Sequence, residues 1–183
     1  LIKCFGAGGL RLGFIAVPKN LRDFLSKMKA VGSETFSSVS GPIQYAAIEA
    51  YTGDYTDYIV KTRSILNSIG RYVYANLKSN NVLINPPQGA FYLMPEFINS
   101  KFKTSLELCD AILNDTGVAL LPGSSFGFNK NKMLTRLSYT DFDGGQFLKN
   151  ISGSEKLGDD VIEKYAPNVV EGANKLSEWS KNL

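Results

Sequence analysis

The chain of 183 residues has a formal net charge of +3, with 44% hydrophobic and 20% charged residues, so it is neither disordered nor strongly basic, and we expect no nucleic-acid partner. No apolar run approaches the roughly 20 residues that span a bilayer, so no membrane partner is expected either. The absence of histidine excludes Ser-His-Asp and Cys-His catalytic pairs, and the two cysteines, Cys4 and Cys109, predict reduced thiols in a cytoplasmic protein with no metal site.

The first thirteen residues are rich in glycine and carry two basic side chains, Lys3 and Arg11. The small residues at positions 6–9 allow a tight turn with close backbone approach. A buried lysine beside another cation has a lowered pKa and becomes nucleophilic, and a planar guanidinium suits a phosphate dianion. A glycine-rich turn with two solvated basic residues is the alternative that this segment alone leaves open.

The next stretch predicts a strand, two helices and a break. The expected elements are a buried strand over residues 12–17, a helix over 21–30 capped by Asn20, a loop over 32–41, and a helix from Ser40 to about Tyr51. An apolar run before a proline favours the strand, and Ser-Gly-Pro is typical of a helix start. Gly53 ends this part of the chain, so we expect a domain boundary there, with residues 1–53 before it and 54–183 after it.

The remainder alternates between helical and strand patterns. The expected elements are a long helix over 54–77, strands over 82–84 and 90–94, a helix over 105–114, strands over 118–121 and 134–139, and a terminal helix from about 159 to 179. Apolar residues recur at helical spacing in the long helix. Strands interleaved with helices indicate an α/β or α+β layer fold.

Three segments of this remainder contain residues suited to a binding site. Residues 87–95 form a Pro-Gln-Gly turn with Gly89 before an aromatic strand, and residues 117–127 contain a Pro-Gly turn with small hydroxyl residues. Arg136 interrupts an apolar, β-prone run, where a buried unpaired charge is costly. A bidentate carboxylate partner would satisfy it. An edge-strand arginine that faces water is the alternative.

Four segments in register resemble one family. The pattern K-x-x-G-A-x-G-x-R-L-G from Lys3, P-x-G-A-F-Y from Pro87, G-V-x-x-x-P-G-x-x-F-G from Gly117 and the strand around Arg136 are similar to class I/II aminotransferases of the aspartate aminotransferase type. The resemblance implies the α/β fold of fold type I enzymes that depend on pyridoxal 5′-phosphate. Residues 1–53 would be the end of the large cofactor-binding domain, and residues 54–183 the small C-terminal domain.

The resemblance also implies a role for each candidate residue. Lys3 would be the catalytic lysine that holds the cofactor covalently, and Arg11 would bind the cofactor phosphate. Arg136 would bind the carboxylate of the amino acid or 2-oxo acid substrate, and Gly89 would leave room for that substrate. The cofactor would act as the electron sink for transfer of the amino group.

Two departures from the family pattern affect these expectations. Ile2 stands where the family has a small residue, often serine, and the family's pyridine-nitrogen aspartate and main phosphate loop lie upstream of the lysine. We therefore expect residues 1–183 alone to be inactive or weakly active, and to need the N-terminal half of the enzyme and a homodimer partner. Other fold type I activities, a C–S lyase or an aminocyclopropane-carboxylate-synthase-like reaction, and a non-catalytic scaffold module remain alternatives.

Overall fold

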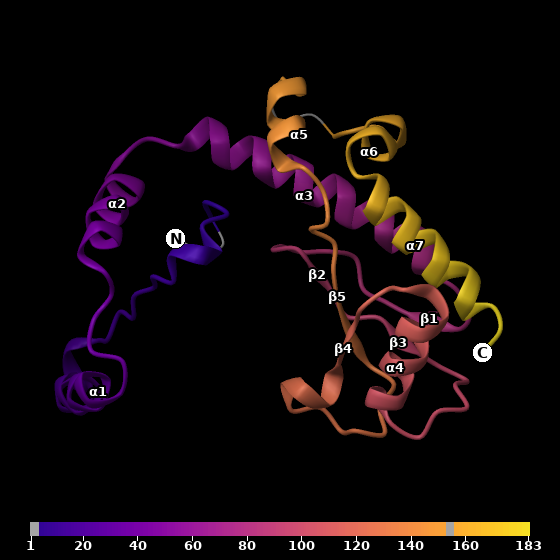
Figure 1. Ribbon diagram of the computed structural model, residues 1–183, viewed down its shortest axis with the longest axis horizontal. Coiled ribbons are helices and arrows are strands. Elements are labelled where there is room, and N and C mark those ends of the chain that lie inside the picture. The colour runs from indigo at the N-terminus through magenta and orange to yellow at the C-terminus, as the bar shows by residue number, and fades with distance from the viewer. Residues whose placement is uncertain (1–3, 153–155) are drawn as a thin grey trace. The chain divides into compact units, whose positions relative to one another are not determined.

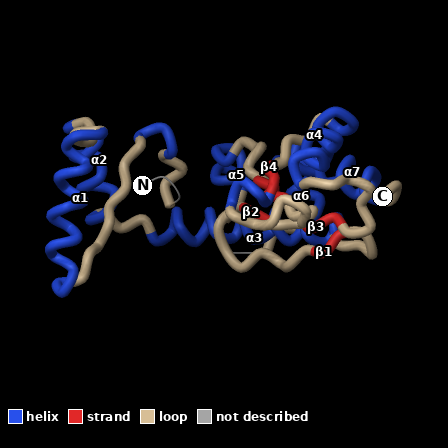
Figure 2. The backbone as a smooth tube through the Cα atoms, turned by 90° about the horizontal axis from the view of Figure 1, so that it is seen from below, coloured by secondary structure: helices blue, strands red, loops and turns tan. Residues whose placement is uncertain are grey.

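The computed structural model describes residues 4–152 and 156–183 and divides into two compact units, Leu1–Ile59 and Val60–Leu183. We call them the first unit and the second unit. Figure 1 gives the order of the elements, and Figure 2 shows that helices predominate over short strands. The division falls inside the long helix α3, Thr56–Leu77, a few residues after Gly53. The assignment of residues 1–53 to one family domain stays a prediction.

The first unit contains two helices, α1 (Arg22–Thr35) and α2 (Gly41–Thr52). The predicted helix start at Ser40-Gly41-Pro42 is confirmed, because Ser40 is the N-cap of α2 and Pro lies in its first turn, where its missing N–H costs nothing. The predicted cap at Asn20 is wrong. Asn20 lies in a 3-10 turn, Lys19–Leu21, and the N-cap of α1 makes no side-chain hydrogen bond.

The strand expected over residues 12–17 is absent from the described part of the first unit. A strand needs neighbours that accept and donate its backbone hydrogen bonds, and no described segment pairs with these residues. The side chains of Phe14 and Ile15 are 74% and 68% exposed. An apolar run without a partner therefore stays irregular here, although its sequence is typical of a buried strand.

The second unit is built around an antiparallel sheet with the order β2-β5-β4. The bounds of its strands are Tyr92–Leu93 for β2, Leu121–Pro122 for β4 and Thr135–Ser138 for β5. A separate pair joins β1 (Val82–Leu83) to β3 (Glu96–Phe97). The strand expected over 118–121 begins later, and β3 was not expected because Pro95 precedes it. Arg136 therefore lies on a central strand, and the alternative of an edge strand is wrong.

The helices of the second unit partly follow the prediction. In addition to α3 they are α4 (Ser105–Thr116), α5 (Gly144–Asn150), α6 (Asp159–Tyr165) and α7 (Pro167–Ser180). The single terminal helix predicted from about 159 to 179 is wrong, because Pro167 cannot continue a helix and starts a new one. The helix α5 was missed, since its sequence opens with two glycines; Asp143 caps it through two backbone N–H groups. None of the described helices is long and apolar enough to cross a bilayer.

The buried core belongs to the second unit and is centred on one face of α3. Ile65, Ile69, Val73 and Leu77 recur at intervals of four residues and are at most 3% exposed. They pack in one cluster with apolar residues of the strands, α4 and α7, among them Leu93, Leu108, Leu137 and Leu176. Full burial of each such aliphatic side chain stabilises the fold by about 1.5–3 kcal/mol. This face of α3 therefore anchors the sheet that carries the candidate site.

A glycine in α3 brings the helix close to the end of β5. An added Cβ at Gly70 would lie 2.7 Å from the hydroxyl oxygen of Tyr139 and 2.9 Å from its ring carbon Cζ. Tyr139 is 1% exposed and donates its hydroxyl to the carbonyl of Ala90 at 3.2 Å. Burial raises the pKa of that hydroxyl to about 12, so it remains a neutral donor.

We expect Gly70→Ala to destabilise the chain by about 1–3 kcal/mol, because the new methyl group collides with a buried ring that cannot leave. The matched control is Gly172→Ala in α7, where the added Cβ meets only a Val118 methyl at 3.8 Å. That control should be neutral or stabilising by up to ~1 kcal/mol, since alanine favours a helix over glycine. Urea unfolding of the wild type and of both variants gives the change in the free energy of unfolding for each substitution. Equal stability of the two variants would contradict the contact between Gly70 and Tyr139.

Candidate functional site

The side chain of Arg136 is flanked by two aromatic rings. Its guanidinium carbon lies 4.4 Å from the ring centroid of Tyr92 and 4.3 Å from that of Phe126. Tyr92 belongs to β2, and Phe126 follows β4, so the rings come from the elements on the two sides of the central strand β5. A cation at this distance from a ring face is attracted by the ring quadrupole. The two rings therefore hold the planar guanidinium in one orientation.

The turn that carries Phe126 is fixed to β5 by a close backbone approach. Gly123 starts the 3-10 turn Gly123–Phe126, and its N–H donates to the carbonyl of Leu134 at 2.8 Å. An added Cβ at Gly123 would lie 2.8 Å from that same oxygen, so only glycine fits without a shift. The turn ends at Gly127 with φ 84°, the left-handed region that favours glycine. The Pro-Gly and Phe-Gly pairs of the sequence motif thus position the ring.

Arg136 has no anionic partner within the described ranges 4–152 and 156–183. The ion pairs formed there include Lys132 with Glu96 at 3.2 Å, but none involves Arg136. Its side chain is half-buried, and its N–H groups remain accessible to solvent, since no buried side-chain nitrogen of the described residues lacks a partner. The rings occupy its neighbourhood without accepting these N–H groups as a carboxylate would. The arrangement can therefore bind a planar anion through the free edge of the guanidinium.

Gly89 lies in a different part of the second unit. It lines an open groove of about 990 Å³ together with Gln88, Ala90 and one face of α3. An added Cβ at Gly89 would meet no atom within 4 Å, so space is available beside it. Arg136 does not line this groove. The structure thus places Gly89 and Arg136 in one unit, with Gly89 but not Arg136 lining this groove.

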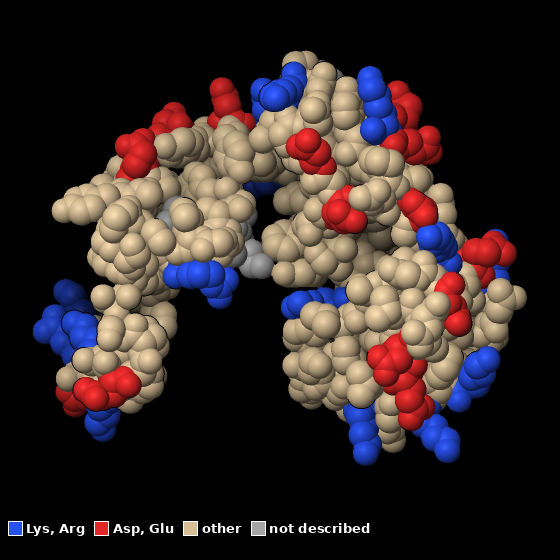
Figure 3. All heavy atoms as spheres, in the orientation of Figure 1, with Lys and Arg blue, Asp and Glu red and all other residues tan. Residues whose placement is uncertain are grey.

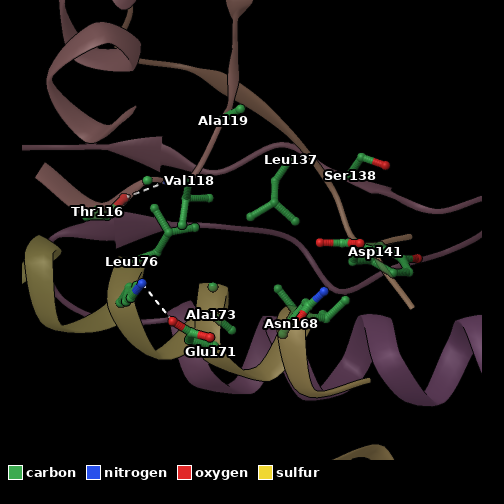
Figure 4. A pocket seen from close by; sticks show the side chains of 16 residues that line it. Thr116, Val118, Ala119, Leu137, Ser138, Asp141, Asn168, Glu171, Ala173 and Leu176 are labelled. Atoms are coloured by element: carbon green, nitrogen blue, oxygen red, sulfur yellow. Dashed lines mark hydrogen bonds and ion pairs between the residues drawn. The ribbon is translucent and has the colours of Figure 1, made fainter. Parts of the chain in front are cut away.

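A second groove, of about 490 Å³, lies between α7 and the segment that follows α4 (Figure 4). Thr116 and Val118 form one wall, and Glu171 on α7 is paired with Lys175 at 2.7 Å. Figure 4 shows Asp141 near the end of β5 and opposite α7. Neither Arg11, Gly89 nor Arg136 lines this groove, and its charged side chains are the pair Glu171 and Lys175 together with Asp141.

Arg11 lies in the first unit, on the glycine-rich turn. It adopts φ 51° at the end of the 3-10 turn Gly8–Leu10, and its Nη1 donates to the carbonyl of Gly8 at 3.3 Å. The residue is exposed, and its other guanidinium N–H groups form no hydrogen bond with the described residues. They fit the chemistry of a phosphate dianion. Lys3 and Ile2 lie outside the described residues.

The two cysteines differ in reactivity. Both are free thiols; Cys4 is exposed and Cys109 is buried in α4. Burial, with a smaller contribution from Asp110, raises the pKa of the Cys109 thiol to about 11, so it stays protonated and is a poor nucleophile. The described ranges contain no group of three or more Cys, Asp or Glu side chains that could hold a metal ion.

The sequence interpretation missed the rings around Arg136. Tyr92 and Phe126 both lie inside segments that the sequence singled out, but their spacing from Arg136 along the chain gives no sign of contact. The only feature of the sequence that could have indicated these rings is that each motif contains an aromatic residue near glycines. The pairing Tyr92 with Ser138, and Leu121 with Arg136, brings the motifs together, and pairing of strands is a property of the folded sheet.

Comparison with known proteins agrees with this geometry. Residues 2–144 match the family described as aminotransferase class I and II. A probable N-acetyl-LL-diaminopimelate aminotransferase of Bacillus subtilis (strain 168) is 36% identical over 126 residues, which cover 69% of this chain and 31% of the relative. An aspartate aminotransferase of Bacillus sp. (strain YM-2) is 34% identical over 124 residues, which cover 65% of this chain and 31% of the relative.

Solved structures show the same fold. An alanine aminotransferase from Pyrococcus furiosus has a TM-score of 0.70 at 23% identity and covers 99% of this chain and 40% of its own length. An aspartate aminotransferase from Thermotoga maritima has a TM-score of 0.66 at 21% identity, covering 98% of this chain and 38% of its own. The chain thus spans less than half the length of the proteins that it matches. It belongs to the aminotransferase class I and II family, whose enzymes use pyridoxal phosphate, and it has the fold type I α/β architecture of that family.

Proposed function

We propose that the chain is part of a pyridoxal-phosphate-dependent aminotransferase that transfers an amino group between an amino acid and a 2-oxo acid. The observation that carries this proposal is Arg136, a half-buried guanidinium flanked by two rings and without a carboxylate partner among the described residues. The names of the relatives, aspartate aminotransferase and probable N-acetyl-LL-diaminopimelate aminotransferase, support substrates that carry carboxylates.

In this proposal Arg136 binds the α-carboxylate of the substrate. Two parallel N–H donors of a guanidinium match the two oxygens of a carboxylate. The rings of Tyr92 and Phe126 restrict rotation of the side chain, so less conformational entropy is lost when the substrate binds. The carboxylate contact thereby fixes the orientation of the substrate's amino group and α-carbon relative to β5. Gly89 stays a proposed neighbour of the substrate, through the space that it leaves beside its Cα.

The first unit would supply the groups that hold the cofactor. Arg11 would bind the phosphate, and Lys3 would hold the cofactor covalently and move a proton at the substrate α-carbon. The bound cofactor supplies an electron sink for the charge left on that carbon. Ile2 has no hydroxyl, whereas the family often has a serine at this position, beside the phosphate. Arg11 would therefore contribute more of the phosphate binding.

The same proposal includes partners and location. We propose that residues 1–53 are the end of the large domain and that residues 54–183 form the small domain. The N-terminal half of the enzyme and a homodimer partner would complete the site. The proposed compartment is the cytoplasm. Exposed apolar side chains in the first unit support the need for a covering partner; Phe14, Phe36 and Tyr45 are each at least 74% exposed. Surfaces of this kind mark protein contacts.

The experiment that tests the function uses the full-length protein with pyridoxal phosphate, an amino acid and a 2-oxo acid. We expect a new amino acid as product and a covalent cofactor adduct at Lys3 after borohydride reduction, measured by peptide mass. Lys3→Ala should abolish both, and Lys19→Ala, an exposed lysine of the same unit, should preserve both. Pyruvate and ammonia as products would instead indicate a C–S lyase. Robust turnover by residues 1–183 alone would contradict the need for the missing part.

For the carboxylate site we expect Arg136→Gln to lower kcat/KM for the amino acid by roughly 10²-fold or more, because two charge-assisted hydrogen bonds are lost. Arg136→Lys should recover only part of that loss, since an ammonium lacks the planar fork. The control is Lys132→Gln, which removes a nearby cation that pairs with Glu96 and should leave kcat/KM unchanged. Steady-state kinetics in full-length protein measures the effect, and an equal loss in the control would count against a specific carboxylate contact.

For the ring on the second side of Arg136 we expect Phe126→Leu to raise KM by roughly three- to tenfold with a smaller change in kcat, because a cation–π contact of about 0.5–2 kcal/mol is removed. Phe128→Leu is the matched control, because Phe128 lies on the same loop and is similarly exposed, 46% against 41%. The control should leave both constants near the wild-type values. An unchanged KM in Phe126→Leu would show that the ring does not position the guanidinium.

A further inference from the structure

The groove that Gly89 lines also contains three cationic side chains that the proposed reaction does not use. Arg63 and Arg71 project from α3, and Lys156 comes from the segment before α6. All three are exposed and line the same open volume of about 990 Å³. Lys156 also lies beyond residue 144, where the family match ends.

The two arginines share one face of α3. Arg63, Asn67 and Arg71 are spaced by four residues, so they lie one above the other along the helix. Arg71 donates its Nε–H to the side-chain oxygen of Asn67 at 3.1 Å, which directs this guanidinium along the row and leaves its other N–H groups available. The Cα atoms of the arginines are about 12 Å apart along the helix axis. A ligand with two anionic groups can contact each guanidinium with a separate group and so gains two charge-assisted contacts.

The opposite wall adds backbone donors. Among the described residues, the N–H groups of Gln88, Gly89 and Ala90 form no backbone hydrogen bond, and all three residues line the groove. Ala90 adopts φ 55°, and its carbonyl is held by the hydroxyl of Tyr139 at 3.2 Å. The loop is therefore fixed in place with its N–H groups unpaired, and left-handed turns of this kind commonly bind anions.

Among the described residues, the charged side chains that line the groove are all cationic. No Asp or Glu is among the described residues that line it, and no described carboxylate forms an ion pair with Arg63, Arg71 or Lys156. Elsewhere charges of both signs are interspersed, as Figure 3 shows for one face. A concave surface with one sign of charge concentrates ligands of the opposite sign.

We propose that this groove binds a small polyanion with at least two separated phosphate or carboxylate groups, one near each arginine. Lys156 and the backbone N–H groups of residues 88–90 complete the set of donors. Arg136 does not line the groove, so the cations proposed here differ from the one that would bind the substrate carboxylate, although Gly89, a proposed neighbour of the substrate, lines it.

The test is titration calorimetry of residues 1–183 at low ionic strength with three probes, which are inorganic tripolyphosphate, citrate and orthophosphate. We expect the better of tripolyphosphate and citrate to bind at least about tenfold more tightly than orthophosphate, and binding to weaken as salt is added. A preference for tripolyphosphate assigns phosphate groups to the ligand, and a preference for citrate assigns carboxylates. Amide resonances of residues 88–90 should shift on titration with the bound probe.

The matched variants remove equal charge. The variant R63Q/R71Q/K156Q should lose about tenfold or more in affinity, while R22Q/K27Q/K29Q, three exposed cations of α1, should bind as the wild type does. Circular dichroism verifies folding, and single Arg63→Gln and Lys156→Gln replace the triple variant if it unfolds. The proposal is overturned if neither polyanion binds, if both triple variants lose affinity equally, or if orthophosphate binds as tightly as the polyanions.

Discussion

The central strand β5 is the constraint on which the second unit depends. Its side chains alternate between two faces, so Thr135 and Leu137 are buried while Arg136 is only half-buried and Ser138 is exposed. The buried residues join the core that α3 anchors, and the next residue, Tyr139, packs against Gly70. A one-residue shift in the register of β5 would turn Arg136 into the core and Leu137 out of it. The position of the guanidinium is therefore fixed by the same packing that stabilises the fold.

Local signals in the sequence were sufficient at some helix ends but were misread at others, since Asn20 does not cap α1 and the new helix that starts at Pro167 was missed. Ser40-Gly41-Pro42 starts α2, and Thr104 caps α4 through the N–H of Glu107 before Gly117 ends the helix with φ 75°. The family assignment likewise depended on short motifs whose residue types are visible in the chain. Signals also failed where the determinant lies far away in the sequence. The apolar run over 12–17 needs a pairing partner, and the neighbours of Arg136 come from β2 and from the turn after β4.

The two units differ in how much of their structure they can stabilise alone. The buried apolar cluster is drawn from residues of the second unit, whereas large apolar side chains of the first unit, such as Phe14 and Phe36, face solvent. Contacts such as the edge-to-face pair of Phe14 with Tyr51, at 5.5 Å, cover only a small part of that surface. Since burial of apolar area is the main source of stability, the second unit is the part whose geometry depends least on a partner.

Arg136 and the arginines of α3 represent two ways of presenting a cation. The rings of Tyr92 and Phe126 attract the guanidinium of Arg136 and restrict the direction from which an anion can approach it. Arg63 and Arg71 are exposed and about 12 Å apart along one helix face, so screening by salt weakens each of them and only a ligand that contacts both gains much. The first arrangement selects a single planar carboxylate by geometry. The second selects by the number of anionic groups that one ligand presents, so the two arrangements favour different classes of anion.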